Sequence, residues 1–181
     1  KKYEYTDTDS QINGLKIPNN KELFSSINWE SLYDGVPSFM HGDLQFDNIL
    51  YDSSSDKFTL LDWRQDFSGE VEFGDLYYDL AKLNGGLFLN YDLIKLNLLD
   101  YQETQNDIFF DFAQRHNTAA YKLILDSFIL DNGYDLDKVN LLTSLIYLNM
   151  SPLHHFPFDK MLFSLGRYML FNEIRKWKDD Q

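Results

Sequence analysis

The chain has 181 residues, a hydrophobic share of 44% and a formal net charge of −13, and it is long enough to fold around a buried core. Because 29 acidic residues face 16 basic ones, and because no apolar run approaches the roughly 18 residues of a membrane span, we expect neither nucleic acid nor a membrane as a partner. The absence of cysteine excludes disulfides and thiol chemistry, and together with the polar start Lys1–Tyr5, which predicts no signal peptide, it favours a cytoplasmic protein.

The first part of the chain predicts little regular structure. Residues 1–18 are polar and weakly patterned, so we interpret them as a lead-in. Asn19-Asn20 is a capping sequence for a short helix that ends near Gly35 and Pro37. The apolar residues of this helix are Leu23, Phe24 and Ile27. We therefore divide the chain into a lead-in with a short helix, residues 1–37, and one larger domain, residues 38–181.

Two β-hairpins are expected in the larger domain. Ile49–Tyr51 and Phe58–Leu61 are short apolar strands joined by a polar turn over residues 52–56. Between residues 94 and 112, apolar and polar residues alternate on both sides of a polar turn at 102–107, which predicts a second hairpin.

The remaining sequence is predicted to be helical. A helix begins at Asp75 and carries an apolar face, and three more helices are expected over about residues 117–131, 136–150 and 158–177. Asn132-Gly133 and Ser151-Pro152 separate the last three. The fold class that this pattern predicts is α+β, mainly α, with short hairpins.

A polar motif lies immediately before the first hairpin. His41-Gly42-Asp43, followed after four residues by Asn48, has the spacing of a kinase catalytic loop. In such a loop the aspartate accepts the proton of the substrate hydroxyl, and the asparagine amide oxygen holds Mg²⁺ on the nucleotide phosphates. The motif predicts that Asp43 is the catalytic base and that Asn48 is a metal ligand.

A second acidic residue stands at the end of the next apolar strand. Asp62 follows Asn48 by fourteen residues, within Leu60-Leu61-Asp62-Trp63. A carboxylate at this point can bridge a metal ion between the nucleotide phosphates. Mg²⁺ prefers oxygen ligands and takes one or two carboxylates together with phosphate and water. Asp62 is therefore the second predicted Mg²⁺ ligand.

These motifs resemble those of the aminoglycoside phosphotransferase and choline kinase family, whose members have a bilobal, protein-kinase-like fold. The resemblance is carried by HGDLQFDNIL, residues 41–50, by LLDW, residues 60–63, and by the helix start GDLYYDLA, residues 74–81. It implies that Asp79 supports the catalytic loop from behind and that His41 shapes the loop. Gln45 matches a glutamine of choline kinases.

The resemblance also implies a segment that this sequence does not show. The nucleotide-covering lobe, with its glycine-rich turn and phosphate-binding lysine, precedes the catalytic loop in the family. Only 40 residues precede His41 here, and Asn13-Gly14-Leu15-Lys16 is not a phosphate loop. We therefore interpret residues 38–181 as the C-terminal catalytic lobe, with the missing N-terminal lobe or upstream segment as an expected partner and little activity in isolation.

Some of these polar residues have structural explanations as well. Aspartates at a helix start satisfy free backbone N–H groups, so Asp75 and Asp79 are candidates for capping, for loop support, or for both. Arg64 is a candidate phosphate contact, although a salt bridge to Asp66 or Glu70 is favoured.

The predicted function is transfer of the ATP γ-phosphoryl group to a hydroxyl of a small molecule, with an amino sugar, an amino alcohol or a sugar as acceptor. One alternative is a catalytically silent kinase-like binding module, against which the intact Asp43, Asn48 and Asp62 argue. Another is a metal-dependent hydrolase built on His41 and Asp43. It needs further ligands, and the remaining histidines have no suitable spacing: His116, His154 and His155.

Overall fold

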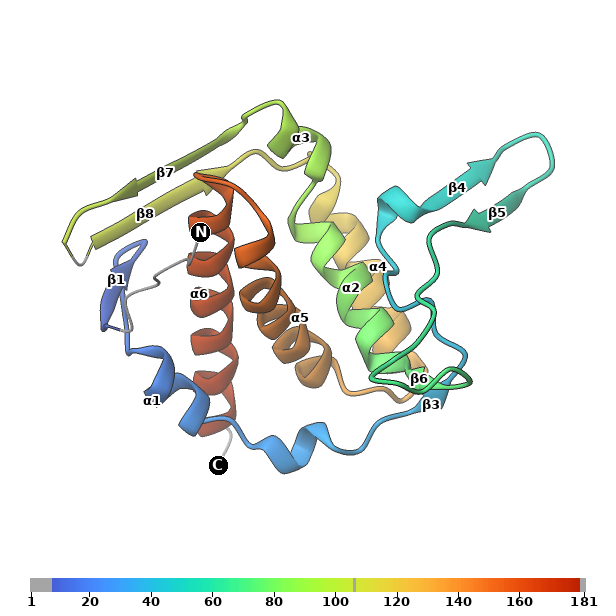
Figure 1. The fold of residues 1–181 in the computed structure, drawn as a ribbon, viewed down its shortest axis with the longest axis horizontal. Helices are drawn as coiled ribbons and strands as arrows, with labels where there is room; N and C mark the ends of the chain where they lie inside the picture. The colour runs from blue at the N-terminus through green and yellow to red at the C-terminus, as the bar shows by residue number, and fades with distance from the viewer. Residues whose placement is uncertain (1–7, 106, 180–181) are drawn as a thin grey trace.

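The computed structural model describes residues 8–105 and 107–179, with side chains described as far as Trp177. About 49% of the chain is helical and 18% is in strands, which confirms an α+β fold with small sheets (Figure 1). The helices are α1 (Asn20–Ser25), α2 (Leu76–Phe88), α3 (Tyr91–Lys95), α4 (Thr118–Asp131), α5 (Leu136–Met150) and α6 (Phe158–Asp179). The strands are β1 (Ser10–Ile12), β2 (Leu15–Ile17), β3 (Pro37–Ser38), β4 (Ile49–Asp52), β5 (Lys57–Leu60), β6 (Gly74–Asp75), β7 (Leu99–Glu103) and β8 (Asp107–Phe112).

The core is built around α5, which packs between α2 and α6 (Figure 1). Val139 belongs to the apolar cluster that α5 shares with α2 and α4, whereas Leu141 belongs to the cluster shared with α6, and both are fully buried. Residues two apart on a helix point to nearly opposite sides, so one helix contributes to both clusters. Packing against α5 therefore holds α2 in place.

The N-terminal segment is part of this core, which corrects the prediction of a weakly patterned lead-in. β1 and β2 form a hairpin across Asn13-Gly14, whose φ values are +48° and +80°. Asn-Gly is the residue pair that a two-residue hairpin turn favours, because both positions need positive φ. Ile12 and Ile17 are fully buried in the cluster around α6. Residues 1–7 of the expected lead-in lie outside the described residues.

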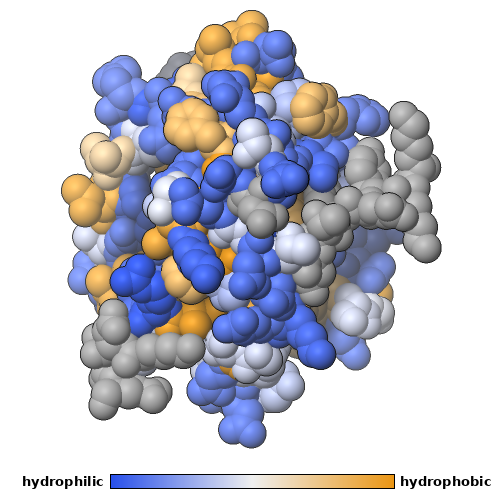
Figure 2. All heavy atoms as spheres, turned by 90° about the vertical axis from the view of Figure 1, so that its left-hand side faces the viewer, coloured by the Kyte–Doolittle hydropathy of each residue, from blue (hydrophilic) through white to orange (hydrophobic). Residues whose placement is uncertain are grey.

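β1 also joins the hairpin of β7 and β8. It runs parallel to β8, which gives a four-stranded sheet in the order β2-β1-β8-β7. The hairpin expected over residues 94–112 is thus confirmed, but its first strand begins later, at Leu99, because Tyr91–Lys95 form α3 under the side-chain cap of Asn90. The side of the molecule that carries this sheet is mostly hydrophilic, with separate hydrophobic patches (Figure 2).

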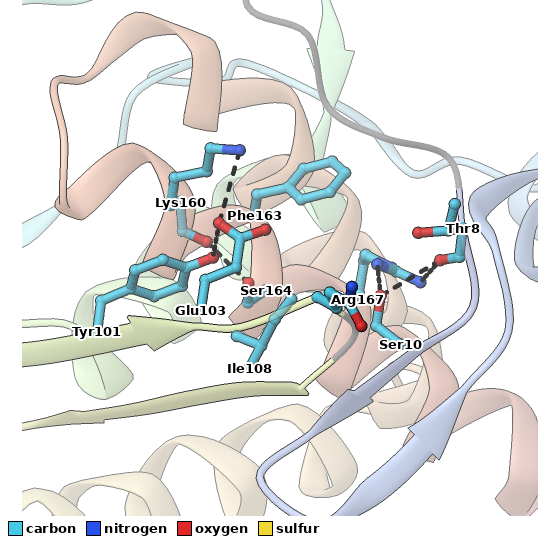
Figure 3. A pocket seen from close by; sticks show the side chains of 10 residues that line it. Thr8, Ser10, Tyr101, Glu103, Ile108, Lys160, Phe163, Ser164 and Arg167 are labelled. Carbon is cyan, nitrogen blue, oxygen red and sulfur yellow. Dashed lines mark hydrogen bonds and ion pairs between the residues drawn. The ribbon is translucent and has the colours of Figure 1, made fainter.

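Arg167 of α6 ties the N-terminal hairpin to the helices. Its guanidinium group is buried and donates to the backbone oxygens of Thr8, at 3.0 Å, and Pro18, at 2.7 Å. It also donates to Ser10 Oγ at 3.2 Å, and Figure 3 shows Arg167 beside Thr8 and Ser10. One side chain thus holds both ends of the hairpin. Buried backbone oxygens need such partners, because an unpaired one costs free energy.

Replacing this arginine tests how much the contact contributes to stability. Arg167→Ala removes three hydrogen bonds and leaves a cavity, so we expect a loss of about 3 kcal/mol of unfolding free energy and a melting temperature lower by roughly 6–12 °C. Arg175→Ala, an exposed position on the same helix, is the matched control and should cost less than about 0.5 kcal/mol. Equal melting temperatures for the two variants would contradict the role of Arg167.

The hairpin predicted at residues 49–61 is confirmed and projects from the helices (Figure 1). Ile49 pairs with Leu60 and Asp52 with Lys57. In its polar turn, hydrogen bonds from Ser55 and Ser54 lower the pKa of Asp52 to about 2.

None of the helices in residues 8–105 and 107–179 is long and apolar enough to cross a membrane.

Candidate active site

The predicted catalytic loop runs from β3 to the short 3-10 helix Phe46–Asn48, and α2 lies behind it. β3 pairs with β6 immediately before α2, with Pro37 opposite Asp75. This pairing brings the chain that enters the loop beside the first turn of α2. Residues separated by about 40 positions in the sequence thereby become neighbours.

Asp79 on α2 holds the backbone of the loop. Its Oδ2 accepts the N–H of His41 at 2.5 Å, and its Oδ1 accepts the N–H of Gly42 at 2.8 Å. The carboxylate is buried, and hydrogen bonds to a charged acceptor are the stronger kind. Gly42 has a φ of +80°, and a Cβ there would lie 2.6 Å from Cβ of Arg64, so the bend in front of Asp43 requires glycine.

The two aspartates at the start of α2 have different partners. Asp75 is the N-cap: its Oδ1 accepts the N–H of Tyr77 at 3.1 Å and also that of Val36 at 3.0 Å. Asp79 lies one turn further, and both of its hydrogen bonds with the described residues go to the loop. Of the two roles that the sequence allows for each, Asp75 caps the helix and Asp79 supports the loop.

This difference predicts different responses to the same substitution. An asparagine at position 79 has only one acceptor oxygen, so Asp79→Asn turns an amide N–H toward a loop N–H and should cost about 2 kcal/mol. Asp75→Asn retains the single oxygen that serves both partners and should cost less than about 0.5 kcal/mol. Urea unfolding of both variants makes the comparison, and the reverse order of midpoints would contradict the assignment.

His41 orients the loop from within. Its ring is buried, and its Nδ1 accepts the N–H of Asp43 at 3.2 Å. In a neutral imidazole this places the proton on Nε2, for which the described residues offer no partner. The ring of Trp63 lies over His41, with centroids 4.9 Å apart. One ring nitrogen is thus occupied by the backbone of Asp43, and the other is buried.

Donors surround the carboxylate of Asp43. Gln45 Nε2 and Asn48 Nδ2 each lie 3.2 Å from Oδ2, and Asn48 Nδ2 also donates to the backbone oxygen of Asp43 at 2.9 Å. Lys82 Nζ lies 2.6 Å from Oδ1. The Asp43 side chain remains 28% exposed, enough for a substrate hydroxyl to reach it. Because the amide nitrogen of Asn48 faces Asp43, its amide oxygen is the atom left for a cation.

Asp62 is held beside this loop by backbone bonds on either side of it. Leu61 N donates to Asn48 O, and Arg64 N donates to His41 O, both at 2.9 Å. Asp62 is exposed and has a φ of +55°, a left-handed conformation that aspartate adopts more readily than most residues. Asp62 and Asn48 both carry side-chain oxygens, the ligand type that Mg²⁺ prefers.

Arg64 does not form the salt bridge that its sequence neighbours favoured. Within the part of the chain that the structure describes, it forms no ion pair with Asp66 or Glu70. Its guanidinium carbon lies 5.7 Å from the ring centroid of Tyr78, a cation–π distance. The aliphatic part of Arg64 packs on the loop at Gly42, and this contact competes with the acidic neighbours.

Lys82 is the residue of this site that the motifs did not single out. It follows Asp79 by three residues, and residues at this spacing share a helix face. That spacing is the signal that points to it, once Asp79 is known to face the loop. Its side chain is only 6% exposed, which is unusual for lysine.

A cavity of about 320 Å³ opens beside the loop, between α2 and the start of α4. Its lining is mixed, with Phe46, Asp47, Gly86, Leu87, Asn90, Asp92, Arg115, Asn117, Thr118 and Tyr121. Two smaller cavities lie beside it, and both are lined by Gln45, Gly86 and Tyr91. Burial and the charges of Asp43 and Asp47 raise the pKa of Tyr91 to about 12, so its hydroxyl keeps its proton at neutral pH.

Of the two adjacent histidines near the C-terminus, His154 packs among aromatic rings. His154 packs against Tyr91 and Phe158, and burial lowers its pKa. Among residues 8–105 and 107–177 no group of three or more His, Cys, Asp or Glu side chains is arranged to hold a metal. A site made of one carboxylate, one amide and nucleotide phosphates does not need such a group.

No family model, no curated protein and no solved structure matches this chain. Its function has to be argued from the residues around Asp43 themselves. Five of the seven residues singled out by the sequence, His41, Asp43, Gln45, Asn48 and Asp79, are joined by hydrogen bonds in one cluster. Asp62 and Arg64 are linked to that cluster through the backbone.

Proposed function

We propose that this chain transfers the γ-phosphoryl group of ATP to a hydroxyl of a small molecule, with Asp43 as the base. The observation that carries the proposal is the pair of bonds from Asp79 to the N–H groups of His41 and Gly42. They fix the backbone in front of Asp43 and so give the carboxylate a defined position. Phosphoryl transfer asks mostly for positioning and charge stabilisation, which such a site supplies.

The residues present account for the steps of this reaction. The acceptor hydroxyl approaches the exposed side of Asp43, which takes its proton as the acceptor oxygen bonds to the γ-phosphorus. Asn48 and Asp62 would hold Mg²⁺, which would neutralise charge on the nucleotide phosphates. His41 keeps Asp43 in place through the backbone and does not exchange a proton with the substrate.

The same proposal assigns the fold to the C-terminal lobe of a protein-kinase-like enzyme, similar to the aminoglycoside phosphotransferase and choline kinase family. An α+β chain with its loop held by a helix and its second acidic residue at a strand end supports this assignment. In that family a second lobe grips the nucleotide. Several large apolar side chains between residues 39 and 73 are exposed and give such a lobe a surface to cover: Phe39, Trp63, Val71 and Phe73.

The 320 Å³ cavity is the proposed acceptor site. Its volume lies at the lower end of small-molecule pockets, and its mixed lining offers hydrogen bonds along with aromatic surface. Asp47 and Asp92 face one cation, Arg115, so the lining carries a small excess of negative charge. An amino sugar, an amino alcohol or a neutral sugar suits these groups.

The two alternatives receive less support from the geometry. A metal-dependent hydrolase built on His41 would need a ring nitrogen for the metal, but Nδ1 accepts the N–H of Asp43 and Nε2 is buried. A silent binding module would not need Asn48 and Lys82 arranged around the carboxylate of Asp43.

Substitution of the base tests the proposal directly. In protein produced from the complete reading frame, Asp43→Asn should lower kcat about a hundred- to ten-thousandfold with the KM for ATP near normal, because only proton transfer is lost. Asp100→Asn, an exposed position on β7, is the control. The assay follows phosphate transfer from labelled ATP to aminoglycosides, choline and common sugars, and an unchanged kcat would remove Asp43 from the mechanism.

The metal assignment is tested by binding. Asp62→Ala removes a charged ligand and should weaken Mg²⁺-dependent ATP binding, and Asp62→Asn should weaken it less, because an amide oxygen remains. Calorimetric titration with ATP at several Mg²⁺ concentrations measures both. The same magnesium dependence in the wild type and both variants would show that Asp62 is not a ligand.

A further inference from the structure

Lys82 is a buried cation whose ammonium group contacts the predicted catalytic loop. Its Nζ contacts Asp43 Oδ1 at 2.6 Å and Met150 Sδ at 3.6 Å. Within the part of the chain that the structure describes, Asp43 is the one carboxylate that forms an ion pair with it. Asp79, one helical turn earlier, holds the two residues before Asp43. One turn of α2 therefore fixes both the backbone and the side chain of the loop.

Stability alone does not explain a lysine at this position. The backbone of the loop is already held by Asp79. Removing an ammonium group from water costs as much as its attraction to a carboxylate returns, and apolar side chains in place of a buried ion pair are often neutral or stabilising. Met150 is the other side chain that Nζ contacts, and a thioether is only a weak acceptor. What lysine adds is charge.

We propose that Lys82 is the positioning residue of the base: it binds Oδ1 of Asp43 and leaves Oδ2 as the oxygen that takes the proton. This inference rests on the proposed phosphoryl-transfer function. The charged contact to Oδ1 is short, whereas the amides of Gln45 and Asn48 reach Oδ2 at 3.2 Å, the long end of the range for N–H···O bonds. A substrate hydroxyl can displace the weaker contacts.

Lys82 also changes the charge balance during the reaction. Before transfer, Lys82 and Asp43 together are neutral. The acceptor O–H bond then breaks and its proton passes to Oδ2, while the acceptor oxygen bonds to the γ-phosphorus and the bond from that phosphorus to ADP breaks. Asp43 is now neutral, and the ammonium charge of Lys82 is uncompensated while negative charge is spread over the transferred group. The close attraction between Lys82 and Asp43 is lost as the proton arrives, and the attraction to the transferred group replaces only part of it, so Lys82 contributes to the rate by positioning Oδ2.

The charge pairing is tested by melting four forms of this chain. Asp43→Asn leaves the ammonium group buried without its carboxylate and should lower the melting temperature by about 5–10 °C. Lys82→Met leaves Asp43 partly exposed to water and should shift it by less than about 3 °C. The double variant should recover most of the loss caused by Asp43→Asn. If the double variant had the same melting temperature as Asp43→Asn, the pairing of the two charges would be overturned.

The catalytic role is tested by kinetics in protein produced from the complete reading frame. Lys82→Met should lower kcat about a hundredfold while both KM values stay within about threefold. In the Asp43→Asn background the same change should cost less than about threefold, because Lys82 acts through Asp43. Lys122→Met is the matched control: Lys122 is 19% exposed, forms an ion pair with Asp126 on α4, and should leave kcat unchanged.

The outcomes separate the two proposals. An equal loss of kcat from Lys82→Met in both backgrounds, or no loss in the wild-type background, would overturn the positioning role. A wild-type protein that transfers phosphate to none of the acceptors would refute the proposed function and with it the catalytic role of Lys82. The melting series would still decide whether the two charges are paired.

Discussion

Two backbone N–H groups that share one buried carboxylate are the constraint on which the rest of the site depends. The bonds from His41 and Gly42 to Asp79 join a loop to a helix that begins more than thirty residues later. A carboxylate without these donors would be costly to bury, and the donors without the carboxylate would be unpaired. Each side therefore stabilises the position of the other, and the geometry of Asp43 follows from both.

The helix that supplies this carboxylate is itself rigidly held. α2 packs on α5, and Asn84 in its centre is fully buried and donates to Thr143 Oγ1 at 2.9 Å. Tyr147 of α5 donates to Gly85 O at 2.6 Å. Polar contacts of this kind fix one register between two helices, which apolar contacts alone do less well. The precision of the loop is thus inherited from the packing of the bundle.

The part of the site that the sequence predicts is the part encoded by local spacing. Asp43 and Asn48 are separated by one loop turn, and Asp62 ends the adjoining hairpin, so their proximity follows from short-range rules. Lys82 was not predicted, because its partner is 39 residues away and its three-residue spacing from Asp79 is the one local signal that distinguishes it from a solvated lysine. The separate roles of Asp75 and Asp79 were likewise open until the chain around Val36 was placed beside α2.

The fold also has a part that local sequence patterns predict and a part that they do not. α2, α4, α5, α6 and both downstream hairpins follow from apolar periodicity and turn residues, whereas α3 and the sheet that unites β1 with β8 do not. Its parallel pairing joins Gln11 to Asp107, and no periodicity within either segment indicates its distant partner. The Asn13-Gly14 pair was a visible turn signal, but three-residue strands are too short for alternation to stand out.

The long reach of that parallel pairing affects the order in which the molecule assembles. The side chain of Asn13 is hydrogen-bonded in both directions to the backbone of Phe110, 97 positions away, while the loop at His41 closes onto α2 across 38. By chain-closure entropy the longer loop costs only about 0.8 kcal/mol more, yet contacts of high sequence separation form late. During synthesis the loop can close on α2 before β8 has left the ribosome. β1 and β2 are made long before β8. Until β8 is available, the edge of β1 is unpaired and open to pairing with another chain.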